Sequence, residues 1–190
     1  MLLITEFIVL LTSNLILTQA LGTSTLFIAA GSKKNLIGTA FTITLFTTVG
    51  SAAAYFISNV LTNNAKDFTL LFYALAVGIL YVLFLTVLYF VSRKTFRNAR
   101  KYIHLSAFNC AVIGTLFTVT QKAQENPQFN NIGSFIIAGA EAGFGFILAS
   151  FILTAAYRRL SSSDVPAAFR GFPAMLIYLG IISMAVYSLT

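Results

Sequence analysis

Residues 68–92 read FTLLFYALAVGILYVLFLTVLYFVS, and the basic stretch RKTFRNARK follows at residues 93–101. A helix that crosses a bilayer needs roughly 20 consecutive, mostly apolar residues, and residues 68–92 supply them. Because lipid offers no hydrogen-bonding partner to backbone groups, we expect this segment to be helical. The apolar run and its basic flank together indicate a transmembrane helix that ends at a membrane surface.

The composition of the whole chain agrees with this interpretation. Of its 190 residues 58% are hydrophobic and 9% are charged, with a mean hydropathy of +0.87, whereas soluble domains contain about 25% charged residues. The net charge of +7 does not indicate binding to nucleic acid, because the cations lie between apolar segments of membrane-spanning length. A single cysteine cannot form a disulfide within the chain. These properties indicate an integral membrane protein.

Six segments of this kind can be distinguished between the polar stretches. We therefore predict an all-α membrane protein with six transmembrane helices in a single domain over residues 1–190. The predicted segments are Leu2–Leu21, Leu36–Val60, Phe68–Ser92, Tyr102–Thr120, Ile132–Tyr157 and Phe172–Leu189.

The distribution of basic residues over the loops predicts the orientation. Two lie in the first loop, five in the third and three in the fifth, whereas the second and fourth loops contain one each. Because cations concentrate in cytoplasmic loops, we expect both termini to lie outside. The cations of the three basic loops are Lys33, Lys34, Arg93, Lys94, Arg97, Arg100, Lys101, Arg158, Arg159 and Arg170.

The six segments divide into two halves, residues 1–97 and 98–190. Each half has three crossings, so equivalent helices run in opposite directions, as in an inverted repeat whose functional site lies near the bilayer midplane. Asn14 in TSNLILTQALG matches Asn109 in AFNCAVIG, and both asparagines are candidates for an ion site or a structural role. The first and fourth segments are also among the shorter ones, which is typical of interrupted helices at a transport or cofactor site. The alternative is a chance division into similar thirds.

Residues that could perform catalysis are scarce. The sequence has no glycine-rich phosphate loop, no paired-carboxylate motif and no complete set of metal ligands. His104, the single histidine, is expected at the membrane interface rather than as a base. We therefore expect no catalytic residue and no enzyme that is complete within this chain.

Glu141 is an unusual carboxylate, because it lies near the centre of the fifth segment, within IIAGAEAGFGF at residues 136–146. A charge at this depth costs roughly 2.5–3.5 kcal/mol on insertion scales, so we expect the side chain in the bundle interior or in a wet cavity. It either binds a cation or proton, or forms a hydrogen bond to a neighbouring helix. The glycines and alanines around it predict close packing against another helix.

Two motifs carry a family resemblance that covers essentially the whole chain: NCAVIG at residues 109–114 and DVPAAFRG at residues 164–171. They resemble the RnfA/NqrE-type membrane subunit of the Rnf ferredoxin:NAD complex and of the sodium-translocating NADH:quinone reductase. By itself, Cys110 would be read as a small buried hydrophobe. The resemblance implies that it is instead a ligand of a metal cluster.

In that family two homologous membrane subunits of inverted topology each contribute two cysteines to one [2Fe-2S] cluster. The resemblance implies that Cys110 is the ligand from the second half. In the first half the family has Leu-Gly-x-Cys where this chain has Leu21-Gly-Thr-Ser24, so Ser24 occupies the position of the other cysteine. Such clusters are normally held by thiolates. With Ser24 at this position, the chain lacks one of the two thiolate ligands that the family supplies.

The resemblance also implies partners and a location. The expected partners are the homologous membrane subunit, flavin-binding and ferredoxin-like subunits and the lipid bilayer, in a bacterial or archaeal cell membrane. Pro166 disfavours helix at the residue before it, so we expect a rigid turn at DVPAAFRG, with Asp164 and Arg170 available for docking a partner.

The predicted function is that of a membrane subunit of a redox-driven ion pump, which passes electrons across the bilayer through the shared cluster. Two alternatives remain. One is a relative without a cluster that serves as an assembly scaffold, and the other is the six-helix solute-binding component of a transporter.

Overall fold

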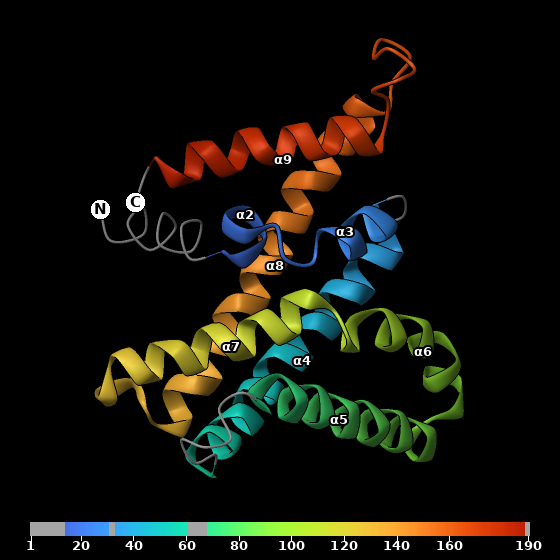
Figure 1. Ribbon diagram of the computed structural model, residues 1–190. Coiled ribbons are helices and arrows are strands. Elements are labelled where there is room, and N and C mark those ends of the chain that lie inside the picture. Colours follow the sequence, from blue (N-terminus) through green and yellow to red (C-terminus); the bar gives the residue numbers. More distant parts are fainter. Residues whose placement is uncertain (1–13, 31–32, 61–67, 189–190) are drawn as a thin grey trace, which may run out of the picture.

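The computed structural model describes residues 14–30, 33–60 and 68–188, and no strand occurs in these ranges (Figure 1). The greater part of the predicted segment Leu2–Leu21 lies outside the described residues. The elements are α2 (Leu15–Gln19), α3 (Thr23–Ala30), α4 (Lys33–Val60), α5 (Thr69–Val91), α6 (Arg93–Ala107), α7 (Cys110–Glu125), the short 3₁₀ helix η2 (Pro127–Phe129), α8 (Ile132–Leu160) and α9 (Phe172–Tyr187).

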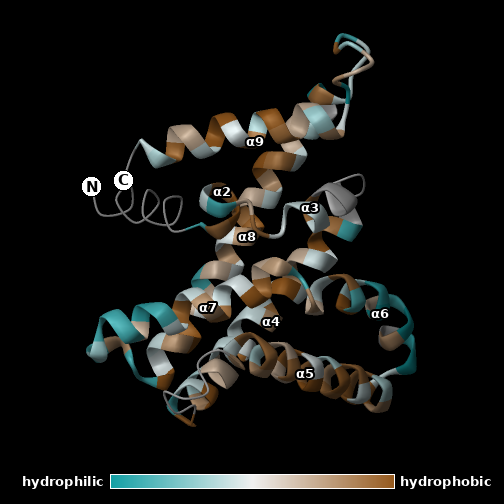
Figure 2. Cartoon of the chain, viewed as in Figure 1, coloured by the Kyte–Doolittle hydropathy of each residue, from teal (hydrophilic) through white to brown (hydrophobic). Residues whose placement is uncertain are grey.

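Three helices in the described part of the chain are long and apolar enough to cross a membrane. They lie at Asn35–Val60, Thr69–Val91 and Ile132–Tyr157, and they confirm the second, third and fifth predicted segments. The bent pair α6–α7 forms a fourth if its two helices are one span, whereas α9 is apolar but shorter. Figure 2 shows α5 and α9 as the most continuously hydrophobic helices.

Helices α4 and α8 pack side by side at the centre of the molecule (Figure 1). A methyl group on Gly139 would lie 2.6 Å from Ser51 Oγ, and one on Gly143 would lie 2.6 Å from Thr44 Cγ2. The backbones therefore approach too closely for any larger side chain at these two positions. This confirms the predicted role of the glycines around Glu141, since small residues allow close contact between membrane helices.

The fourth predicted segment, Tyr102–Thr120, is broken, which agrees with its interpretation as an interrupted helix. Helix α6 ends at Ala107 and α7 begins at Cys110, with an angle of 53° between the two helices. The break arises at Asn109, whose extended backbone (φ −74°, ψ 139°) caps α7. A residue in this conformation cannot continue the preceding helix.

The third loop, which carries the largest group of cations, is also helical. Its basic residues lie on α6 and are exposed, whereas Ile103 and Ala107 are buried against the chain. The Lys101 ammonium donates to Asn35 Oδ1 at 3.0 Å and thereby connects α6 to α4. The predicted loop is therefore an amphipathic helix, visible at the right of Figure 2.

Candidate functional site

The two broken segments meet at their breaks. The backbone N–H of Gly22, between α2 and α3, donates to Cys110 Sγ at an N···S distance of 2.9 Å, across 88 positions of sequence. A Cβ on Gly22 would lie 2.8 Å from the Cβ of Ala111 and 3.2 Å from Asn109 Oδ1. The first turn of α7 is thus packed directly against the turn that joins α2 to α3.

Local backbone chemistry explains the first break. Ala20 adopts the left-handed conformation at the end of α2 (φ 55°), and its N–H donates to Ile16 O at 3.0 Å. Gly22 follows with φ +83°. Such positive φ values suit glycine because it has no side chain, so the sequence ALG ends α2 and allows α3 to start in a new direction.

Asn14 and Asn109 occupy the same kind of position, each at the N-terminal cap of a helix. Asn14 Oδ1 accepts from the N–H groups of Ile16 and Leu17, and its Nδ2 donates to Gly145 O at 2.7 Å. Asn109 Oδ1 accepts from Ala111 N at 2.9 Å. The match between the two asparagines is therefore a match of capping roles, and both side chains hold helix ends in place.

The two caps differ in one respect. Asn109 is buried, and its Nδ2 has no hydrogen-bond partner in the structure, whereas Asn14 uses its Nδ2. An unpaired buried amide costs about 1–3 kcal/mol. The unpaired N–H group belongs to the residue that immediately precedes Cys110 in the chain.

Cys110 is exposed at the start of α7, and it is the only cysteine of the chain. Ser24 is exposed in the first turn of α3 and follows Gly22 by two positions. The break that contacts Cys110 is therefore the break that precedes Ser24. Among the described residues no group of three or more histidine, cysteine or acidic side chains could hold a metal ion.

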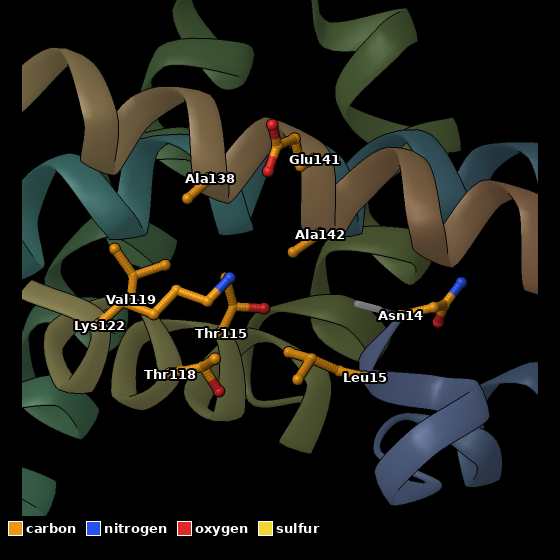
Figure 3. A pocket seen from close by; sticks show the side chains of 9 residues that line it. All are labelled: Asn14, Leu15, Thr115, Thr118, Val119, Lys122, Ala138, Glu141 and Ala142. Atoms are coloured by element: carbon orange, nitrogen blue, oxygen red, sulfur yellow. The ribbon is translucent and has the colours of Figure 1, made fainter. Parts of the chain in front are cut away.

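A small polar pocket lies next to this junction, between α2, α7 and α8 (Figure 3). Its volume is about 30 Å³, and a water molecule needs roughly 10–15 Å³, so it suits one or two waters or a small ion. The lining residues are Asn14, Leu15, Thr115, Thr118, Val119, Lys122, Ala138, Glu141 and Ala142.

Glu141 belongs to this pocket, but its side chain is exposed rather than buried in the bundle. Figure 3 shows its carboxylate apart from the Lys122 ammonium, and neither charged group makes a hydrogen bond or ion pair with another described residue. The predicted hydrogen bond to a neighbouring helix is therefore not formed. The alternative location in a wet cavity agrees with the pocket.

The fifth loop is held by Arg170. Its guanidinium donates to Ser163 O and to Val165 O at 3.1 Å, while Asp164 accepts from Ser162 Oγ at 3.3 Å. The turn at DVPAAFRG is therefore ordered by bonds from Arg170 to backbone carbonyls rather than by a pair with Asp164. Docking of a partner at this loop stays a prediction.

His104 lies on the exposed side of α6, as expected for an interfacial residue. Arg100 Nε donates to His104 Nε2 at 2.9 Å, and Tyr81 Oη is hydrogen-bonded to His104 Nδ1. The histidine therefore connects α6 to α5.

Sequence reasoning missed the contact residue Gly22 and three polar residues of the pocket: Thr115, Thr118 and Lys122. The three polar residues recur at helical spacing and lie on one face of α7. That periodicity in a predicted transmembrane helix was a usable signal. Nothing local to ALG, in contrast, predicts that it contacts a cysteine 88 positions away.

Comparison with known proteins extends over nearly the whole chain. Residues 3–190 match the family model described as "Rnf-Nqr subunit, membrane protein". A protein of Glaesserella parasuis, named as the A subunit of an ion-translocating oxidoreductase complex, is 27% identical over 182 residues. These residues cover 95% of this chain and 91% of the relative.

Two further relatives carry the same name. The protein of Pseudoalteromonas atlantica is 28% identical and aligns over 98% of this chain and 97% of its own length. The protein of Vibrio vulnificus is 25% identical over the same shares. Together with the family model, these similarities confirm the resemblance inferred from the two motifs, and the chain belongs to the Rnf-Nqr subunit family of membrane proteins.

Proposed function

We propose that this chain is a membrane subunit of a redox-driven, ion-translocating oxidoreductase complex and that it passes electrons across the bilayer. The observation that carries this proposal is the meeting of the two breaks at the thiol of Cys110. A contact between interrupted helices near the bilayer midplane is typical of a cofactor or transport site. The relatives, whose names describe a component of ion-translocating oxidoreductase complexes, support the same function.

The cofactor proposed for this site is a [2Fe-2S] cluster shared with a homologous membrane subunit. The residues present fit part of a ligand set: Cys110 supplies one thiolate, and Ser24 stands near the same break. The N–H of Gly22 and the unpaired Nδ2 of Asn109 are donors beside the thiol, and hydrogen bonds to cluster sulfurs tune the reduction potential. When bound, such a cluster supplies one-electron transfer.

The other ligands of the cluster must be groups other than cysteines of this chain, because Cys110 is its one cysteine. Exposure of Cys110 supports this arrangement, since a buried thiol could not reach a second subunit. The proposed partners are a homologous subunit of inverted topology and the flavin-binding and ferredoxin-like subunits of the complex.

The proposed topology has six spans in two inverted halves with both termini outside the cytoplasm of a bacterial or archaeal cell. The central packing of α4 against α8 supports equivalent helices from the two halves, and the cations of α6 support a cytoplasmic third loop. Reporter fusions in α6 and at the C-terminus should report opposite sides of the cell membrane. Two cytoplasmic signals would contradict this topology.

The iron content and electron paramagnetic resonance spectrum of the purified complex test the cluster. Cys110→Ala should abolish the signal at this subunit interface, and Ser24→Cys should shift it, because a thiolate would replace an oxygen ligand. Ser163→Cys, in the fifth loop, adds a thiol away from the junction and should leave the spectrum unchanged. Unchanged iron in Cys110→Ala would assign the thiol to packing.

A second candidate function is an assembly scaffold without a cluster, which the serine at position 24 favours. A complex that assembles with Cys110→Ala and holds no iron at this interface in either form would support it. The solute-binding alternative is not favoured, because residues 3–190 match the Rnf-Nqr subunit family.

The polar pocket is proposed as the place where ion movement is coupled to this subunit. Glu141 contributes a carboxylate within a span and Lys122 a compensating charge at the same pocket, and such intramembrane charges are typical of ion and proton pathways. Glu141→Gln should reduce ion transport in vesicles about tenfold or more without changing the iron content. Equal transport by the variant would leave Glu141 without this role.

A further inference from the structure

The strongest unassigned surface of the molecule is the basic face of α6. Five exposed cations lie within the first nine residues of this helix, and its sequence has no acidic residue. Like charges at this density repel one another unless an anionic partner covers them. The exposed cations are Arg93, Lys94, Arg97, Arg100 and Lys101.

The position of this face relative to the bilayer follows from α5. That helix is apolar from Thr69 to Val91, and its buried residues are Tyr73 and Val77, so it has the length and exposure of a lipid-facing span. Helix α6 begins at Arg93, separated from α5 by Ser92 alone. Its first turns must therefore lie at the level of the lipid headgroups.

The opposite face of α6 holds the helix against the protein. Ile103 and Ala107 are buried, and Tyr102 Oη donates to Asn35 Oδ1 at 3.3 Å. The 53° bend at Asn109 also turns α6 away from the direction of α7. The cations are thus presented on a fixed helix and not on a flexible loop.

Aromatic residues underlie the cations in the manner of an interfacial belt. The guanidinium of Arg93 lies 5.6 Å from the ring centre of Tyr89, and the ammonium of Lys101 lies 4.8 Å from that of Tyr102. Tyrosines are enriched at the membrane interface, where the ring contacts acyl chains and the hydroxyl contacts water. Lysine and arginine stems extend along such surfaces and carry their charges to the headgroups.

We propose that the basic face of α6 is a binding surface for anionic phospholipid headgroups. Each lysine or arginine near an anionic leaflet strengthens the attraction, and the attraction decreases within a Debye length. The surface recognises phosphate oxygens of phosphatidylglycerol or cardiolipin and distinguishes them from zwitterionic lipid by net charge.

Lys94 and Arg97 provide the cleanest test, because neither side chain makes a hydrogen bond, ion pair or ring contact within the described part of the chain. The double variant Lys94→Gln/Arg97→Gln should weaken binding of phosphatidylglycerol about fivefold per removed cation. The variant Lys94→Arg/Arg97→Lys keeps both charges and should bind as the unaltered protein does. Lys122→Gln removes a cation outside α6 and should leave the binding of phosphatidylglycerol unchanged, whatever its effect on ion transport at the polar pocket.

The measurement is native mass spectrometry of the purified complex, titrated separately with phosphatidylglycerol, cardiolipin and phosphatidylcholine. We expect retention of the two anionic lipids, weaker retention at higher salt and no dependence of phosphatidylcholine binding on the variants. Unchanged affinity of the glutamine variant for phosphatidylglycerol and cardiolipin would overturn the proposal. So would unchanged lipid binding together with loss of another subunit, because the face would then dock a protein.

Discussion

The two breaks that meet at Cys110 both separate consecutive helices, and they differ in chemistry. The break between α2 and α3 is formed by left-handed Ala20 and by Gly22 (φ +83°), and it is followed by Ser24. The break before α7 is formed by a capping asparagine, Asn109, and is followed by Cys110. Similar interruptions are thus produced by unrelated local signals, and a thiol follows only the second.

The contact between the breaks is also reciprocal. A Cβ on Gly22 would lie 2.8 Å from the Cβ of Ala111, and a Cβ on Gly114 would overlap Leu21 Cδ1. Each break therefore provides a glycine that admits a side chain from the other. Both halves contribute to packing at the junction, whereas the thiol of Cys110 and the unpaired amide of Asn109 both belong to the second half.

The largest effect is expected from Gly22→Ala, which should break the contact itself. The new methyl group meets Ala111, a short side chain that cannot rotate away, and the positive φ disfavours any residue with a Cβ. Strain and overlap together should cost about 3 kcal/mol. Thermal denaturation of the purified full-length chain in detergent, followed by circular dichroism, measures the loss.

Gly180→Ala is the matched control for this substitution. Gly180 is helical and a Cβ there would have nothing within 4 Å, so alanine should be neutral or slightly stabilising through its higher helix propensity. A similar destabilisation by both alanines would show that the junction is not specially packed.

A smaller effect separates the two asparagines. Asn14→Ala removes two capping bonds and the bond to Gly145 O, which should cost about 2 kcal/mol. Asn109→Ala removes one capping bond but also an unpaired buried amide, so the net cost should be about 0.5 kcal/mol. The same denaturation experiment compares them.

This second comparison has a defined failure. If Asn109→Ala is as damaging as Asn14→Ala in the isolated chain, the amide of Asn109 has a partner there and the two caps are equivalent. If Asn109→Ala causes a large loss of stability only in the assembled complex, the amide donates to a group bound at the subunit interface, as proposed for the cluster.

A small effect, comparable to that of Asn109→Ala, is expected from Gly114→Ala, the reciprocal of the first substitution. The methyl group would meet the end of Leu21, a flexible side chain that can adopt another rotamer. The gain in helix propensity offsets part of the strain, so the net change should be below about 1 kcal/mol. A loss as large as that of Gly22→Ala would show that Leu21 is held as rigidly as a backbone.

Several features of this protein were predictable from local pattern. The apolar segments at Leu36–Val60, Phe68–Ser92 and Ile132–Tyr157 correspond closely to α4, α5 and α8, because hydrophobic length is a property of consecutive residues. The motifs NCAVIG and DVPAAFRG were sufficient for the family. The third loop, which carries five cations, was correctly predicted to separate two apolar segments, but its helical structure was missed.

The site was predicted less completely. Asn14, Asn109 and Cys110 were identified, and the structure brings the last two together with Gly22. Glu141 was expected in the bundle interior or in a wet cavity and is exposed at the edge of a pocket with Lys122. Which neighbours surround a side chain depends on distant segments, so the pattern around Glu141 did not predict them.

The sequence alone determined that the chain is helical, resides in a membrane and belongs to its family, because these properties depend on hydrophobic length, charge distribution and short motifs. The tertiary structure decided where the fourth segment breaks and what each break contacts. The bond from Gly22 to Cys110 spans 88 positions and the bond from Asn14 to Gly145 spans 131. Such contacts depend on how distant segments pack against one another, which no local pattern of residues specifies.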